Sequence, residues 1–479
     1  MTHAPSDRTD ATLLVQIGVV LLGGIMGILN SSMVTVGNHA IATQFGSSVS
    51  TLGWVSTGYL LALTVTIPVT AWAVDRVGGK RLWLGSLVLF LAASVACGLA
   101  WDIGSLIFFR VVQGIGAGVL DPLVLVLLAR AAGPARAGRV MGLMGLVLSL
   151  GPVLGPVLGG AVLQGFGWRS MFMINLPIIV IAFLLALRFV PEDQPGAEQH
   201  RDRLDVVGLA LVGPGIALLV LALSQAAERG AFGAWQVVVP LVLGLVLVVG
   251  YGVKALGARK IPPLVDLRLF LHRGFTVSVA VMGLSGIANF AVFFALPLYY
   301  QKIHGTGASE SGLLIAPLGL GAAAAMPLAG RLSDKLGSRT LAVAGALVAL
   351  VAVFGFTQID GDTNQLWTVV AGLASGLGMG FVGAPAMGAM YRTLPPHLVP
   401  QGSSVLYMLN QLGASVGIAA AAFILQTVGS TTIGGFHATY WFAFGATVVV
   451  LIGALLISDR ATPTGGDRPV VEEREPTAG

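Results

Sequence analysis

Long apolar runs alternate with short polar clusters along the chain from Leu13 almost to Ser458. A helix needs about twenty apolar residues to cross the roughly 30 Å hydrocarbon layer of a bilayer, and the runs are of about this length. They predict fourteen membrane-spanning helices. We expect these near residues 13–37, 50–74, 82–100, 104–129, 138–163, 170–190, 206–226, 236–256, 274–299, 310–330, 340–359, 366–391, 402–427 and 438–458.

Two longer polar stretches divide the spans into groups of six, two and six. The pattern predicts an all-α integral membrane protein with two six-helix bundles and two inserted helices. The expected units are a cytoplasmic N-terminus (1–12), an N-terminal bundle (13–190), a linker (191–205), the inserted helices (206–256), a second linker (257–273), a C-terminal bundle (274–458) and a disordered tail (459–479).

The composition agrees with a membrane protein. Of the 479 residues, 56% are hydrophobic and only 10% are charged, whereas soluble proteins carry roughly 25% charged residues. A soluble surface of this size would need more charge, so a soluble protein is excluded. Cys97 is the only cysteine, which rules out an intrachain disulfide.

The placement of the 26 Lys and Arg residues predicts the orientation. If the N-terminus lies inside, only Arg169, Arg229 and Lys302 fall outside, and Arg110 falls within a span. Cytoplasmic loops carry most Lys and Arg residues in membrane proteins, so both termini are expected in the cytoplasm. The basic excess therefore reflects membrane orientation and does not indicate a nucleic-acid partner.

Two motifs occur in the same order in both halves of the chain. One reads D-[basic]-x-G after spans two and ten, and the other reads G-x-G-x-G some forty residues later, followed by a proline. Equal orientation of the two copies predicts parallel repeats related by an axis along the membrane normal. The copies are Asp75–Gly78 with Gly114–Gly118 and Pro122, and Asp334–Gly337 with Gly376–Gly380 and Pro385.

Several segments resemble the fourteen-span drug:proton antiporter family of the major facilitator superfamily. The segments that carry the resemblance are Asp75–Arg81 with its second copy, Leu106–Gly118, Gly145–Gly160, Trp168–Pro177, Leu296–Gln301 and Gly402–Gly413. The resemblance implies a secondary active exporter of small amphipathic drugs or antibiotics. It would exchange them for protons by alternating access in the bacterial inner (plasma) membrane.

The same resemblance implies a monomer whose partners are its small-molecule substrate, protons and membrane lipids. The sequence contains no HExxH motif, no GxxxxGK[ST] loop and no arrangement of a nucleophile with a base. We therefore expect neither an enzyme nor ATP hydrolysis, and no cofactor or metal.

Two sets of residues are candidates for gating. Glycines four residues apart leave a bare stripe on span five where another helix can pack closely, and the neighbouring prolines bend a helix. This pattern predicts a hinge at the interface of the two bundles, formed by Gly151, Pro152, Gly155, Pro156 and Gly159. Charges in the repeated cytoplasmic loops are expected to hold the inner gate, namely Asp75, Arg76, Arg81, Asp334 and Arg339.

Arg110 and Asp121 are the candidates for proton coupling in span four. A charge inside a span costs roughly 2.5–3.5 kcal/mol, so it normally faces a cavity or a partner. Eleven residues place both side chains on nearly the same helix face, about 16 Å apart along the axis, which is too far for direct pairing. Asp121 is expected to bind the coupling proton.

Span one departs from the family pattern. The family usually has L-D-x-T-I-V-N-V-A-L-P-x-I, whereas this chain has Asn30 in place of the acid, Thr35 in place of the inner asparagine and His39 in place of the proline. Asn30 cannot carry a proton. Either coupling has moved to Asp121, with His39 as a second titrating group, or the protein does not use proton antiport and is a facilitator or a lipid or metabolite transporter.

Aromatic and polar side chains within the spans are candidates for substrate binding. Such a lining suits amphipathic molecules that are held mainly by burial of apolar area. The candidates are Asn30, Trp54, Tyr59, Gln113, Asn289, Phe293, Tyr299, Tyr407, Asn410 and Gln411.

Overall fold

The structure is a computed structural model that describes residues 6–47, 49–132, 151, 154–155, 158–192, 205–229, 233–257, 263–265, 267–395, 398–429 and 431–457. Every regular element in these segments is a helix. Thirteen helical segments among them are long and apolar enough to cross a membrane. The all-α membrane fold expected from the apolar runs is confirmed. The remaining expected span, near 138–163, falls largely on residues outside the described segments.

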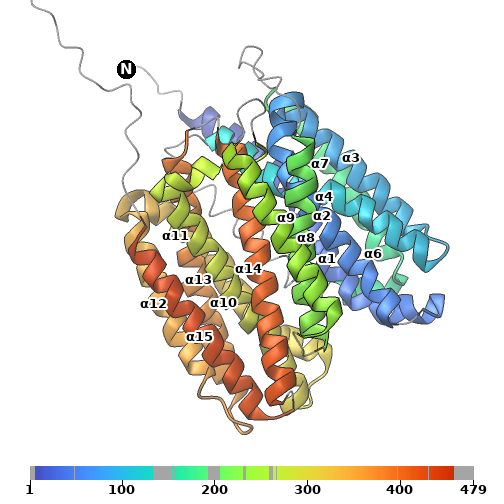
Figure 1. Cartoon of the computed structure of the whole chain (residues 1–479), viewed down its shortest axis with the longest axis vertical. Coiled ribbons are helices and arrows are strands. Elements are labelled where there is room, and N and C mark those ends of the chain that lie inside the picture. The colour runs from blue at the N-terminus through green and yellow to red at the C-terminus, as the bar shows by residue number, and fades with distance from the viewer. Residues whose placement is uncertain are drawn as a thin grey trace, which may run out of the picture.

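The helices form two groups with a helix pair between them (Figure 1). The N-terminal group contains α1 (Ser6–Phe45), α2 (Val49–Val77), α3 (Gly79–Gly98), α4 (Ile103–Ala132), α6 (Ser170–Met173) and α7 (Asn175–Phe189). The pair between the groups is α8 (Val206–Arg229) and α9 (Trp235–Gly257), followed by the short 3-10 helix η2 (Leu267–Leu271). The C-terminal group contains α10 (Arg273–Ile303), α11 (Ala308–Leu336), α12 (Ser338–Phe356), α13 (Gln365–Thr393), α14 (Val399–Val428) and α15 (Ile433–Leu455).

The two D-[basic]-x-G motifs adopt the same backbone geometry. Gly78 alone separates α2 from α3 with φ 90° and ψ 153°, and Gly337 alone separates α11 from α12 with φ 88° and ψ 149°. Positive φ of this size is accessible to glycine but rarely to residues with a Cβ. The expected loops are therefore single-residue turns, and their charged residues lie in the adjoining helix ends, because one glycine suffices to reverse the chain.

The glycines of the second motif make equivalent contacts in the two halves. A Cβ on Gly114, Gly116 or Gly118 would collide with the backbone of α2 or α3, and a Cβ on Gly376, Gly378 or Gly380 would collide with the backbone of α11 or α12. The contacted residues correspond one to one, at the sequence interval that separates Gly78 from Gly337. The pairs are Tyr59 and Leu318, Phe90 and Ala349, and Leu63 and Ala322. The structure thus supports the internal repeat at the level of individual contacts.

Among the described residues, the apolar contact between the two groups lies at one end. One continuous cluster of buried apolar side chains runs from the N-terminal group into the ends of the C-terminal helices near Phe275, Ala342, Met390, Val405 and Ala454. The opposite ends of the same helices form a separate cluster, which contains no residue of the N-terminal group. The helices that meet across the joined end are α14 on one side and α2 and α4 on the other.

The inserted helix α8 packs against α2 and α14, and therefore touches both groups. Gly213 of α8 lies against the backbone of Val65 in α2. Helix α9 packs on the outer side of α8, and much of its surface is exposed aliphatic side chain. The pair therefore covers the contact between α2 and α14 from the membrane side.

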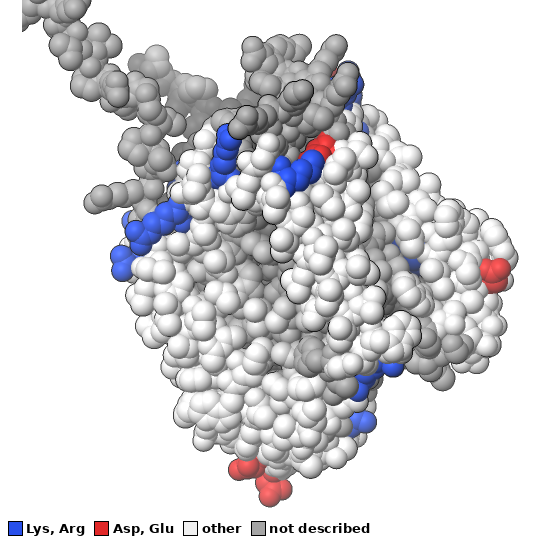
Figure 2. Space-filling model, viewed as in Figure 1, with Lys and Arg blue, Asp and Glu red and all other residues white. Residues whose placement is uncertain are grey.

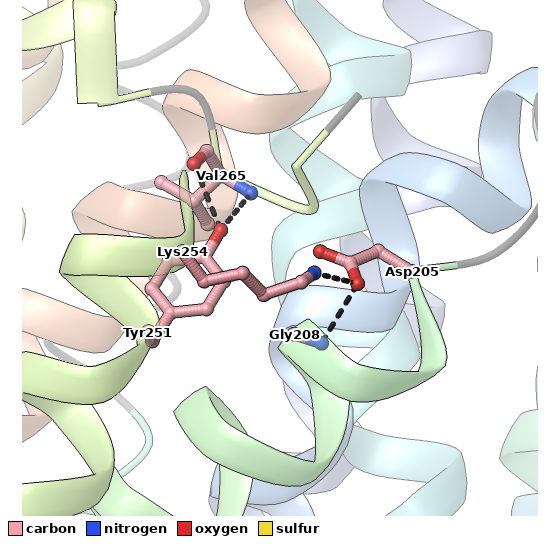
Figure 3. A network of polar contacts seen from close by, with 5 residues as sticks. All are labelled: Asp205, Gly208, Tyr251, Lys254 and Val265. Carbon is pink, nitrogen blue, oxygen red and sulfur yellow. Dashed lines mark hydrogen bonds and ion pairs between the residues drawn. The ribbon is translucent and has the colours of Figure 1, made fainter. Parts of the chain in front are cut away.

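Polar contacts fix the base of this pair (Figure 3). The buried Asp205 carboxylate forms an ion pair with Lys254 of α9 and accepts the Gly208 N–H at 2.8 Å, which caps the first turn of α8. The Tyr251 hydroxyl accepts the N–H of Val265 at 2.7 Å and donates to its carbonyl at 2.8 Å. The segment before η2 is thereby attached to α9.

Charged residues are absent from most of the molecular surface in view. Figure 2 shows a wide middle zone that carries almost no Lys, Arg, Asp or Glu, with charged side chains gathered toward the two ends. Aliphatic side chains that are more than half exposed occur on several helices, among them Leu184, Val246, Val351 and Val370. A surface of this kind matches lipid hydrocarbon in the middle and headgroups or water at the ends.

The ion pair at the base of α8 and α9 gives a stability prediction. Lys254→Met leaves the buried Asp205 carboxylate without its cation, so we expect the free energy of unfolding to fall by about 1–3 kcal/mol. Thermal unfolding of the purified protein in detergent measures the change. The double variant Asp205→Asn/Lys254→Met removes both charges and should unfold closer to the wild type. A double variant less stable than Lys254→Met would contradict this account.

Candidate functional site

A fully buried guanidinium occupies the interior of the N-terminal group. Arg110 of α4 has no exposed surface. Its Nη1 donates to Asn30 Oδ1 of α1 at 2.6 Å and to Gln113 Oε1 at 2.7 Å, and its Nε donates to the Val55 carbonyl of α2 at 3.0 Å. The side chain therefore connects three helices through neutral acceptors.

Aromatic faces complete the surroundings of the Arg110 charge. The Tyr59 ring of α2 lies 4.1 Å from the guanidinium carbon, and the Phe172 ring of α6 lies 5.9 Å from it. A ring face attracts a cation through its quadrupole. No described carboxylate lies within ion-pair distance of Arg110, so its charge is stabilised by dipoles and aromatic faces.

The network extends to α3 and α7. Gln113 Nε2 donates to the Ser94 hydroxyl at 2.6 Å, and Asn175 Nδ2 donates to the same oxygen at 2.9 Å. Among the described residues, Arg110 Nη2 and Asn30 Nδ2 have no hydrogen-bond partner. Interhelical hydrogen bonds of this kind hold membrane helices together where burial of apolar surface gives no driving force.

Asp121 lies further along α4, next to Gly27 of α1. Its Oδ1 is 3.3 Å from the position that a Cβ on Gly27 would occupy. The carboxylate is partly exposed and has no hydrogen bond to another described residue. Tyr59 of α2 and Tyr407 of α14 lie in its neighbourhood, and α4 contacts both of these helices. Asp121 is therefore near both groups of helices, and it does not pair with Arg110.

The glycine stripe of the fifth span lies against α1. A Cβ on any of the three glycines would meet α1, at Ile28, Ser32 and Met33 in turn. The contact seen here is thus within the N-terminal group, because it is α1 that presents its backbone to the stripe. The residues concerned are Gly151, Gly155 and Gly159, whereas Pro152 and Pro156 lie outside the described residues.

The ten predicted substrate residues fall into four environments. Asn30, Tyr59 and Gln113 are buried in the Arg110 network. Tyr299 is buried at the far end of the C-terminal group, where its hydroxyl donates to the Asp360 carbonyl at 2.9 Å, and Trp54 is 46% exposed. The remaining five are half-buried on α10 and α14, namely Asn289, Phe293, Tyr407, Asn410 and Gln411.

The other predicted residues lie at helix ends or outside the described side chains. Asp75, Arg76, Arg81 and Arg339 are exposed beside the two glycine turns. The backbone of His39 and Asp334 is helical, but their side chains are not among those described.

Sequence reasoning missed the partners that complete the network. Ser94 and Phe172 carried no signal that distinguishes them from other residues of an apolar span. Asn175 did carry one, since it is a polar residue at the start of an apolar run in a motif already noted. A polar side chain within a span usually has a polar partner on another helix.

A comparison with known families identifies the architecture. Residues 20–418 match the Major Facilitator Superfamily. This chain belongs to that superfamily. It is therefore a multi-pass membrane transporter of small molecules and not an enzyme.

Relatives of this major facilitator protein include named resistance proteins. A "Multidrug resistance protein B homolog" of Mycobacterium tuberculosis is 37% identical over 88% of this chain and 77% of that protein. "Lincomycin resistance protein LmrB" of Listeria monocytogenes is 28% identical, with 85% of each chain covered. "Riboflavin transporter RibZ" of Clostridioides difficile is 29% identical over 84% of this chain and 86% of that protein. The resemblance to drug exporters read from the motifs is confirmed.

Solved structures agree on the fold. The human organic anion transporter MFSD10 superposes with a TM-score of 0.62 at 17% identity, covering 93% of this chain and all of that one. The proton:xylose symporter XylE superposes with a TM-score of 0.63 at 16% identity, covering 93% and 95%. At these identities the likeness extends to the fold alone.

The uncompensated guanidinium gives a second prediction. Asn30→Asp places a carboxylate at hydrogen-bond distance from Arg110 Nη1, so a neutral acceptor becomes a charged one. We expect the free energy of unfolding at neutral pH to rise by about 1–3 kcal/mol. Thermal unfolding in detergent checks this, with Asn30→Leu as the opposite control because it removes the acceptor. A lower melting temperature for Asn30→Asp would mean that the guanidinium is already satisfied.

Proposed function

We propose that this transporter is a secondary active exporter that moves small amphipathic molecules, including antibiotics, in exchange for protons by alternating access. The observation that carries the proposal is the position of the Asp121 carboxylate, which is near α1 and α2 of one group and α14 of the other. The names of the relatives from Mycobacterium tuberculosis and Listeria monocytogenes support the substrate class.

Asp121 is suited to sense which way the transporter opens. Movement of α14 away from α4 would change what surrounds the carboxylate, because Tyr407 would leave it. The proton affinity of a carboxyl group depends on its surroundings. A group that is exposed alternately to the two sides of the membrane can therefore take up a proton on one side and release it on the other. Arg110 would support this role by holding α4 against α1 and α2.

Orientation follows from the positive-inside rule. We propose that both termini lie in the cytoplasm of a bacterium and that the protein resides in the plasma membrane. The joined end of the two groups is then the cytoplasmic end, and this conformation faces outward. The division into an N-terminal bundle (13–190) and a C-terminal bundle (274–458) belongs to the same proposal, with Gly78 and Gly337 on the inner side.

The half-buried residues of α10 and α14 are the proposed substrate lining. Asn289 Oδ1 and the Tyr407 hydroxyl are buried and have no hydrogen-bond partner among the described residues, so a polar group of the substrate would supply the partner that each lacks. Phe293, about one helical turn after Asn289 on α10, offers an aromatic surface. A lining of few polar groups and much apolar area suits amphipathic molecules of varied shape.

A transporter without proton antiport is the second candidate. Asn30 cannot be protonated. Its amide oxygen is the neutral acceptor of the Arg110 hydrogen bond, and no pH change would alter it. The relative from Clostridioides difficile is named a riboflavin transporter. These two observations favour a metabolite transporter or facilitator as the alternative.

Transport in proteoliposomes separates the two candidates. We expect an imposed pH gradient to drive ethidium transport by the wild type, and Asp121→Asn to reduce the rate to the level without a gradient, because an amide cannot carry the proton. Asp102→Asn is the matched control, since Asp102 is an exposed carboxylate outside the spans.

Riboflavin and lincomycin are tested in the same assay. If a compound crosses at rates that ignore the gradient, and Asp121→Asn transports it as the wild type does, the protein is a facilitator and the antiport proposal is wrong.

A further inference from the structure

Tyr59 lies near two ionisable residues of α4, Arg110 and Asp121. Its side chain is buried, with 1% of its surface exposed. The ring face lies 4.1 Å from the Arg110 guanidinium, and the hydroxyl donates to the Gly27 carbonyl of α1 at 3.2 Å. The hydroxyl and Asp121 Oδ1 lie 3.6 Å and 3.3 Å from one point, where a Cβ on Gly27 would stand. The ring of this one side chain therefore lies against Arg110, and its hydroxyl lies on the side of Asp121.

The same residues hold one turn of α1 at two places. Tyr59 binds the Gly27 carbonyl, and Arg110 binds the Asn30 side chain one turn later. The absence of a side chain on Gly27 leaves the space in which the Asp121 carboxylate lies. The position of this turn of α1 is thus coupled to both Arg110 and Asp121, although these two residues do not contact each other.

We propose that Tyr59 is a positioning residue for proton coupling, which acts through the Gly27 carbonyl to hold Asp121 in a fixed relation to the Arg110 network. The inference rests on the proposed function of Asp121. It also changes the role of Tyr59, which its residue type alone suggested to be a substrate contact. A side chain that is buried on all sides and bonded at both ends does not line a cavity in this conformation.

The charged and titratable groups around Asp121 are few. Among the described residues, Tyr59 faces it from α2 and Tyr407 faces it from α14, and Arg110 lies further along α4. On α1 the facing residue is Gly27, which does not titrate. A change at Tyr59 therefore alters one of two phenols beside the carboxylate and the bond that positions the turn of α1 against it.

Tyr59→Phe is the decisive variant, because it keeps the ring against Arg110 and removes only the hydroxyl. We expect the pH midpoint of ethidium transport to shift by about half a unit to one unit, the equivalent of one neutral hydrogen bond. The KM for ethidium should remain that of the wild type. Tyr300→Phe is the matched control, since Tyr300 is a buried tyrosine that bonds Thr368 at 2.7 Å in the far cluster. It should leave the pH profile unchanged.

A second pair of variants tests the same site without removing a hydrogen-bonding group. Gly27→Ala adds a methyl group 3.3 Å from Asp121 Oδ1, so it should also shift the pH midpoint. Gly18→Ala, on the same helix, adds a methyl group into open space and should not.

The outcomes are distinct. A changed KM or substrate preference with an unchanged pH profile in Tyr59→Phe would make Tyr59 a substrate contact and overturn the inference. A lower melting temperature with unchanged transport would overturn it too, since the role would be structural only. If Asp121→Asn uncouples transport while both Tyr59→Phe and Gly27→Ala keep the wild-type profile, this inference fails and the proposed function stands. If Asp121→Asn has no effect, the proposed function itself fails.

Discussion

The constraint on which the N-terminal group depends is the permanent charge of Arg110 in the interior of a membrane protein. An arginine does not lose its proton at any physiological pH, so the surrounding helices must stabilise the cation. Four other helices do so, α1 directly through Asn30, α2 through Val55 and Tyr59, α6 through Phe172, and α3 indirectly through Ser94. Because the contacts come from several helices, the guanidinium fixes their relative positions as no pair of apolar side chains could.

Local features were predictable from the sequence, and contacts between distant segments were not. Hydropathy determines where a helix can cross lipid, and the glycine motifs recur because close helix contacts require them, so the spans and the repeat could be read directly. Residue type does not determine which neighbours a side chain faces, however. Tyr299 and Tyr407 look alike in sequence, yet Tyr299 lies in the far cluster and Tyr407 packs against the cluster that joins the two groups. The partners of Arg110 and the contact of the Gly155 stripe with α1 depend on packing between segments far apart in the chain.

The internal repeat also defines where the halves differ. At the interval that relates Gly114 to Gly376, Arg110 corresponds to Gly372 and Asp121 corresponds to Gly383. Both halves thus keep the glycines that set helix packing, but only the first carries ionisable residues at these two positions. The shared contacts maintain the fold, and the differing positions are free to acquire chemistry.

Helix α8 cannot stay attached to both groups if they part. Its partner α9 is tied to Val265, and the following η2 is joined to the start of α10, where Thr276 donates to the Phe270 carbonyl. We therefore expect the pair to move with the C-terminal group and to slide along α2. Gly213 suits such sliding, because α8 has no side chain at the point where it crosses Val65 of α2.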